Sequence, residues 1–274
     1  MFEQIWYYEL LVVLYASSVL LYFYDFLQNN RKANQFAFWL LSIVWVIQTV
    51  YIGMSAIQKG ILPLFSQFDT LFFYAWLLIT LSLLINWFFR MDLILFFTNV
   101  IGFTVLSLSL FVAGREIPAQ MAEQLSSEWL LIHISMAFIS YAAFTFSFIF
   151  SSFYLVQHSM LKKKKWTKHV RRLPSLVQLD LYTFRLNLIG VPLLLLSLIL
   201  GIVWGYYTLD ASFLYDPKVI FSILVLLMYG VYLYQRVVKG WSGRRIVELN
   251  IICFLVLLIN YLLASIFSKF HLWM

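Results

Sequence analysis

The chain has 274 residues, of which 63% are hydrophobic and 11% are charged, and its formal net charge is +7. Soluble globular domains contain about 25% charged residues and about 45–50% apolar ones. The composition therefore excludes a water-soluble globular protein and indicates a protein that crosses a membrane several times.

Apolar runs that are long enough to span a membrane recur along the whole chain. A helix needs roughly 20 apolar residues to cross about 30 Å of hydrocarbon. The sequence therefore predicts an all-α integral membrane protein with eight transmembrane helices: Ile5–Tyr24, Phe36–Ile57, Thr70–Phe89, Leu93–Ala113, Trp129–Val156, Tyr182–Tyr206, Val219–Val238 and Val247–Phe270. The acidic Glu3 and the lack of a small-residue cleavage site predict that the first run is a retained span, not a signal peptide.

The basic residues predict the orientation of these spans. Because Lys and Arg are enriched in cytoplasmic loops, the side that is richer in them is expected to be inside. Fifteen of the 19 basic residues fall on one side: Arg31, Lys32, Arg90, Lys162 to Lys165, Lys168, Arg171, Arg172, Arg185, Arg236, Lys239, Arg244 and Arg245. The other side has Lys59, Arg115, Lys218 and Lys269. Both termini are therefore expected to lie outside.

The chain shows no internal repeat, and its connections are too short for a water-soluble domain. Residues 1–274 are therefore expected to form a single polytopic membrane domain. The longest inner connection, residues 157–181, separates five predicted spans from three and is a candidate packing boundary. It contains KKKKWTKHVRR (Lys162–Arg172), whose charge suits either a nucleic acid or anionic lipid. The positive-inside bias favours the lipid bilayer as the partner, and no nucleic acid is expected.

Few polar or reactive side chains lie within the spans. The sole cysteine, Cys253, rules out a disulfide framework, a CxxC redox pair and covalent attachment of haem through CxxCH. The buried amides are expected to form hydrogen bonds between helices; they are Gln48, Asn86, Asn99, Asn187 and Asn260.

Two of the four histidines stand out by their place in the predicted topology. His158 and His169 fall in or beside the basic inner connection, where a solvated histidine is expected. His133 and His271 fall at the outer ends of the fifth and eighth spans. Two neutral imidazoles from separate helices can ligate the iron of a six-coordinate haem. The alternative is that each histidine only anchors its helix at the membrane interface, as Trp and Tyr do.

An aromatic stretch, WGYYTLDASFLYDPK (Trp204–Lys218), joins two spans on the same outer side. A haem is a flat apolar ring with two carboxylates, so it favours aromatic faces and nearby cations. We expect Trp204, Phe213 and Tyr215 to form an aromatic shelf for haem b. Trp129 and Tyr141 lie on the same helical stripe as His133, which suits a cofactor wall or ordinary bundle packing.

The end of this stretch also predicts a helix start and a cation. Asp216 followed by Pro217 is typical of an N-cap and a first helical residue. Lys218 and Arg115 are candidates to pair with the haem propionates. Snorkelling of both side chains to the membrane interface is an equal alternative.

These motifs resemble the cytochrome c assembly family of the CcsA and CcmC type. In LIHISMAFISYAAF (Leu131–Phe144), His133 is followed seven residues later by Ser140, Tyr141 and Ala142, as in that family. Trp204 and the closing Asp216-Pro217-Lys218 match its tryptophan-rich WWD signature. His271 falls where the family has its second external haem ligand. The resemblance covers residues 129–271.

The chain also departs from the family pattern. Phe213 and Tyr215 replace two tryptophans, and Tyr234 in YLYQR replaces the buried histidine of YLHTR. The length, the eight spans and the weakened signature are most similar to the HemX branch, found in the membrane of Gram-positive bacteria. That branch is regarded as a non-enzymatic membrane protein that lowers the level of glutamyl-tRNA reductase.

Three function classes remain open at this point. The resemblance to HemX implies haem handling and control of haem biosynthesis in the bacterial plasma membrane, with glutamyl-tRNA reductase as a partner. The wider family implies a haem exporter, or an assembly factor that presents haem to a cytochrome c assembly partner. A membrane scaffold without haem is the third class.

Overall fold

The computed structural model describes residues 2–59, 62–64, 66–89, 91–111, 127–164, 172–208 and 211–267. Within these ranges the chain is helical and contains no strand. The elements are α1 (Phe2–Gln28), α2 (Arg31–Lys59), α3 (Gln67–Phe89), α4 (Asp92–Phe111), α6 (Glu128–Lys162), α7 (Leu176–Thr208), the 3-10 helix η2 (Ala211–Tyr215), α8 (Pro217–Val237) and α9 (Arg244–Phe267). Eight of them are long and apolar enough to cross a membrane, which confirms the eight predicted spans.

Two asparagines set where α2 begins. The turn between α1 and α2 uses Asn29 at φ 57°, a left-handed conformation that Asn tolerates well. The next residue, Asn30, then accepts hydrogen bonds from the backbone N–H groups of Lys32 and Ala33 at 3.0 and 3.3 Å. This side chain satisfies two of the backbone donors that α2 leaves unpaired at its start.

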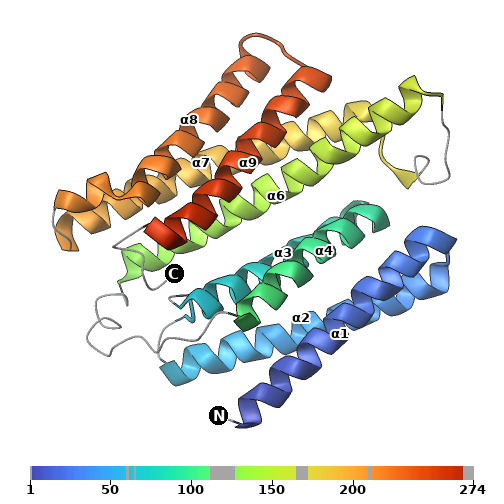
Figure 1. Cartoon of the computed structure of the whole chain (residues 1–274), viewed down its shortest axis with the longest axis horizontal. Helices are drawn as coiled ribbons and strands as arrows, with labels where there is room; N and C mark the ends of the chain where they lie inside the picture. Colours follow the sequence, from blue (N-terminus) through green and yellow to red (C-terminus); the bar gives the residue numbers. More distant parts are fainter. Residues whose placement is uncertain are drawn as a thin grey trace. The chain divides into compact units, whose positions relative to one another are not determined.

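The chain divides into two compact units, Met1–Glu116 and Ile117–Met274. In the first unit each helix packs on its neighbours in chain order, and α4 closes the ring on α1. The second unit repeats this arrangement with α6 to α9, in which α6 and α7 make the most extensive contact (Figure 1). The division therefore falls between four spans and four, not within the basic connection, because α6 pairs with α7 across that connection.

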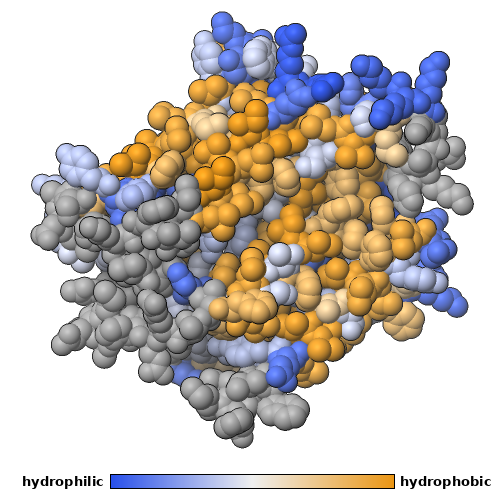
Figure 2. Space-filling view, viewed as in Figure 1, coloured by the Kyte–Doolittle hydropathy of each residue, from blue (hydrophilic) through white to orange (hydrophobic). Residues whose placement is uncertain are grey.

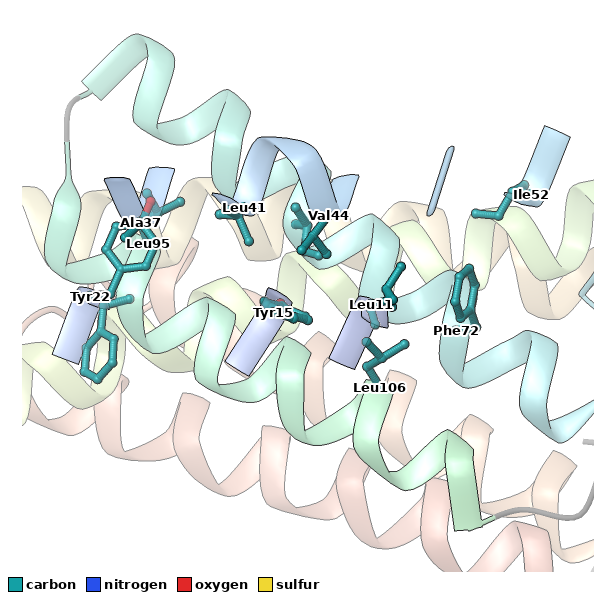
Figure 3. Close-up of a cluster of buried hydrophobic side chains, with 13 residues drawn as sticks. Leu11, Tyr15, Tyr22, Ala37, Leu41, Val44, Ile52, Phe72, Leu95 and Leu106 are labelled. Atoms are coloured by element: carbon teal, nitrogen blue, oxygen red, sulfur yellow. The ribbon is translucent and has the colours of Figure 1, made fainter. Parts of the chain in front are cut away.

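An apolar core fills the first unit. Leu11 and Tyr15 of α1, Leu41 of α2, Phe72 of α3 and Leu106 of α4 are all buried in it (Figure 3). Every helix of the unit contributes apolar side chains to this cluster, so close packing is one of the interactions that hold the four helices together. Additional residues of the same cluster are Tyr22, Ala37, Val44, Ile52, Ala75, Ile79, Leu95 and Phe96.

The buried amides link helices in both units, as expected for three of the five. Asn99 accepts from the Tyr15 hydroxyl at 2.9 Å and donates to Ser82 Oγ at 3.1 Å, which joins α1, α3 and α4. The remaining links are Asn187 Nδ2 to Asn250 Oδ1 at 2.7 Å and Asn260 Nδ2 to Ser222 Oγ at 3.2 Å. Such bonds are worth about 0.6 kcal/mol each on average within membranes, so they specify helix partners more than they add stability.

The outer surface of the described helices is largely apolar. Figure 2 shows hydrophobic residues over most of the visible face, with hydrophilic residues gathered mainly toward its edges. Large apolar side chains point outward from the spans, among them Leu20, Val50, Leu108, Leu196 and Leu227. Lipid is the solvent that such a surface requires, so the protein is a multi-pass membrane protein. Cys253, by contrast, is buried within α9.

Candidate haem-binding site

His133 lies in the second turn of α6 and faces α7. Its ring atom Nδ1 is 2.5 Å from the backbone carbonyl oxygen of Ser197. A carbonyl can only accept, so Nδ1 carries the proton and donates it to Ser197. The other ring nitrogen, Nε2, then keeps a free electron pair, which is the form of imidazole that ligates a metal.

Ser197 holds His133 through its side chain as well as through its carbonyl. Its hydroxyl donates to the backbone oxygen of His133 at 2.9 Å and also lies 3.1 Å from Nδ1. Ser197 itself is buried, at 1% exposure. The backbone and the ring of the histidine are therefore both tied to one residue of the neighbouring helix.

Gly201 provides the space for the imidazole. A Cβ atom at this position would lie 2.6 Å from His133 Cε1 and 2.9 Å from Nδ1. Both distances are too short for non-bonded atoms. The ring therefore occupies the space that the side chain of any residue other than glycine would need at position 201. This is the close approach for which glycine is required.

Gly205, one turn further along α7, makes the same kind of space for Phe213. A Cβ at Gly205 would lie 2.7 Å from Cε2 of the phenyl ring. Phe213 belongs to η2 and is buried, at 4% exposure. Its ring thus attaches η2 to α7, whereas the half-buried Trp204 and the exposed Tyr215 keep accessible surface for a ligand.

The start of α8 is built as the sequence predicts. Asp216 is the N-cap, with Oδ1 accepting from the backbone N–H of Lys218 at 2.9 Å, and Pro217 is in the first turn. This confirms the expected cap. Lys218 is thus the second residue of α8, and its side chain is half-buried there.

The remaining expected residues divide by position. Tyr141 hydrogen-bonds Ser222 of α8, which also accepts from Asn260 of α9, so Tyr141 is part of a contact among three helices. Trp129, in the first turn of α6, points outward at 61% exposure. His158 lies near the other end of α6 and stacks on the ring of Tyr154 in the same helix, with centroids 6.0 Å apart.

His271, Arg115 and His169 lie outside the described residues, so the expected second ligand and the second propionate partner stay predictions. The structure brings His133 and Phe213 of η2 to the same end of α7, where His133 contacts Ser197 and Gly201 and Phe213 contacts Gly205. Trp204 lies in the last two turns of α7, and Lys218 lies at the start of α8.

The chemistry of these residues fits a haem. In the described part of the chain, no group of three or more His, Cys, Asp or Glu side chains is placed to hold a bare metal ion. In a haem the four porphyrin nitrogens already coordinate the iron, so the protein supplies only the axial ligands. The free Nε2 of His133 suits that role, and the Lys218 ammonium suits a propionate.

Sequence reasoning missed Ser197, Gly201 and Gly205, which shape this end of α7. Their spacing of four residues was the available signal, because it places all three on one face of a helix. Small residues at this spacing also line ordinary contacts between membrane helices. The pattern alone therefore does not distinguish a site that holds a histidine ring from ordinary close packing.

Comparison with known proteins identifies the family to which the chain belongs. A family model described as "Cytochrome C assembly protein" matches residues 64–272. Protein HemX of Bacillus subtilis (strain 168) is 50% identical over 260 residues, which cover 95% of this chain and 94% of that protein. Protein HemX of Brevibacillus brevis is 49% identical over 273 residues and covers 100% of both chains.

The chain is more distantly similar to CcsA proteins. Cytochrome c biogenesis protein CcsA of Guillardia theta is 25% identical over 238 residues, which cover 81% of this chain and 79% of that protein. CcsA of Prochlorococcus marinus (strain MIT 9301) is 28% identical over 254 residues. The region that holds His133, the aromatic stretch and Lys218 lies within the family match.

Proposed function

Because this chain belongs to the cytochrome c assembly protein family, we propose that it is a membrane haem-binding protein of the HemX type. It binds haem b without a covalent link, near the outer face of the bacterial plasma membrane. His133 and His271 are the axial ligands of the iron. We assign the protein a binding role, without a catalytic step.

One observation carries this proposal: the imidazole of His133 is held with Nδ1 bonded to the Ser197 carbonyl at 2.5 Å, and Nε2 is left to accept a metal. Histidines that ligate metals commonly donate their second ring N–H to a backbone carbonyl in this way. A histidine that only anchors a helix at the interface has no need of such a bond.

Other residues of the site have separate roles in the proposal. Trp204 and Tyr215 offer aromatic faces, and Trp129 and Tyr141 lie on the helix stripe of His133. The Lys218 ammonium pairs with a propionate, as does Arg115. Phe213 and Asp216 act indirectly, since Phe213 seats η2 on Gly205 and Asp216 caps the helix that carries Lys218.

An absorption spectrum tests the proposal directly. Protein purified after haem supplementation is expected to show a low-spin spectrum with two imidazole ligands. The changes His133→Ala and His271→Ala are each expected to convert or abolish it. His158→Ala is the matched control, because His158 lies near the other end of α6, and its spectrum is expected to be unchanged. An unchanged spectrum in both ligand variants rules out the assigned ligands.

The regulatory part of the proposal follows from similarity to the HemX branch. The protein lowers the level of glutamyl-tRNA reductase, either by direct contact or through another protein. A deletion strain is expected to contain more of that enzyme, and the wild-type gene is expected to restore the normal level. Complementation with His133→Ala tells whether haem binding is needed. A reductase level unaffected by deletion contradicts the regulatory role.

A second function is favoured by the similarity to CcsA proteins, whose name refers to cytochrome c biogenesis. In that case the protein presents haem to a cytochrome c assembly partner. Loss of c-type cytochromes on deletion, with an unchanged reductase level, is the result that selects this function over the first.

A further inference from the structure

The imidazole seat consists of Ser197 and Gly201, two residues of α7 that touch His133 of α6. We propose that these residues are positioning residues, which fix His133 as the Nδ1-protonated tautomer and reserve Nε2 for the iron before any ligand arrives. This inference rests on the proposed haem-binding function for its purpose, but the seat itself is a property of the protein without haem.

The first step concerns access to the Ser197 carbonyl. In an α-helix this oxygen already accepts the N–H of residue 201, one turn later. It has a second electron pair, but the side chain of the residue one turn later normally covers it. Glycine at position 201 removes that cover, and the ring of His133 fills the space, with Cε1 only 2.6 Å from where a Cβ would be.

The second step concerns rotation of the ring. The Ser197 hydroxyl donates to the backbone oxygen of His133 at 2.9 Å, and the Ser197 carbonyl accepts from Nδ1 at 2.5 Å. These two contacts hold the backbone and the ring of His133 against the same residue. A half-turn of the ring about Cβ–Cγ would put the carbon Cδ2 where Nδ1 lies and break the bond to the carbonyl, so one orientation is selected.

The third step concerns the effect on a bound iron. A histidine that donates its distal N–H to a carbonyl is a more basic ligand, because the bond adds negative character to the ring. A more basic ligand favours the ferric state. The seat therefore lowers the midpoint potential of the haem as well as setting which nitrogen binds.

The decisive experiment is nitrogen NMR of the haem-free, full-length protein labelled with ¹⁵N-histidine in detergent micelles. The resonances of His133 are assigned by their loss in His133→Ala. The wild-type protein is expected to give the pattern of a single Nδ1–H tautomer. In Gly201→Ala the Cβ displaces the ring, so the pattern is expected to shift toward a mixture of tautomers.

Two controls separate the seat from a general effect on the helices. Gly230→Ala in α8 introduces the same methyl group where nothing lies within 4 Å, and it is expected to leave the His133 resonances unchanged. Ser197→Ala keeps the carbonyl but loses the hydroxyl, so the Nδ1–H pattern is expected to persist with a broader signal. After haem loading, Gly201→Ala is expected to raise the midpoint potential relative to Gly230→Ala.

The outcomes distinguish this inference from the proposed function. If the protein binds haem through His133 but Gly201→Ala leaves the histidine resonances unchanged, the seat is overturned and the function stands. If the Nδ1–H tautomer is found and shifts in Gly201→Ala, but His133→Ala retains the haem spectrum, the ligand assignment fails and the seat stands. An Nε2–H tautomer in the wild-type protein overturns the seat directly.

Discussion

Arg236 of α8 and Asp180 of α7 form an ion pair, with Nη2 2.7 Å from Oδ2. The two side chains are only 16% and 12% exposed. Arg236 also donates to the backbone oxygen of Trp241 at 2.8 Å, in the connection that follows α8. This guanidinium therefore joins α7, α8 and the turn toward α9.

Replacing Asp180 with Asn is expected to destabilise the protein, because it leaves the largely buried guanidinium without its counter-charge. A hydrogen bond to a charged group is worth about 1.5–3 kcal/mol. Thermal unfolding in detergent provides the measurement. Glu248→Gln is the matched control, since the Arg244–Glu248 pair is 60% and 43% exposed. Exposed pairs contribute about 0–1 kcal/mol, so equal losses in the two variants would contradict the role of Arg236.

Asp216 is expected to matter as a cap, not as a charge in the haem site. Changing it to Ala removes the acceptor for the Lys218 N–H and costs about 1 kcal/mol of stability. Asp216→Ser retains a capping oxygen and is expected to restore most of the loss. Thermal unfolding and haem content should be measured together. A serine variant as unstable as the alanine variant would show that the carboxylate has another role.

Gly205 and Phe213 are expected to behave as a coupled pair. Gly205→Ala forces the phenyl ring away from α7, and overpacking of this kind costs about 1–3 kcal/mol. Phe213→Leu alone is expected to cost less stability, and it leaves space beside α7. The double variant is expected to be more stable than the sum of the single effects predicts, as contacting residues usually show. Strict additivity in unfolding measurements would mean that the two residues do not touch.

Lys218 is expected to contribute charge to haem binding. Lys218→Met keeps the apolar stem but removes the ammonium at the start of α8, and haem affinity is expected to fall by about 5- to 10-fold, on the order of 1 kcal/mol. Lys218→Arg retains the charge and is expected to bind nearly as well. Titration of haem into each purified variant measures this. An unchanged affinity in Lys218→Met would support the alternative of simple snorkelling.

Much of the fold follows from the sequence because it depends on local patterns. The eight spans come from hydropathy, the start of α8 from Asp216 and Pro217, and the family from the motif around His133 together with the closing Asp-Pro-Lys. Each of these signals involves residues that are close together in the sequence. Each can therefore be recognised without knowing which helices pack together.

The pairing of helices and the contacts inside the site could not be predicted from such local patterns. Ser197 meets His133 across 64 positions of the chain, and nothing in a run of apolar residues shows that α6 pairs with α7. Phe213 was expected to offer its face to a haem, yet the structure places the ring on Gly205. A missing Cβ is visible in a sequence only as a glycine, and its purpose appears when the neighbour is known.

The burial of Cys253 has a practical consequence for the expected orientation. The natural thiol lies inside α9, so a maleimide that cannot cross membranes should leave it unmodified. A cysteine introduced at the exposed Tyr207 or at Lys239 would then be labelled without background. In intact cells we expect Tyr207→Cys to react and Lys239→Cys to react only after permeabilisation. The reverse pattern would turn the whole topology over, and the haem site would then face the cytoplasm.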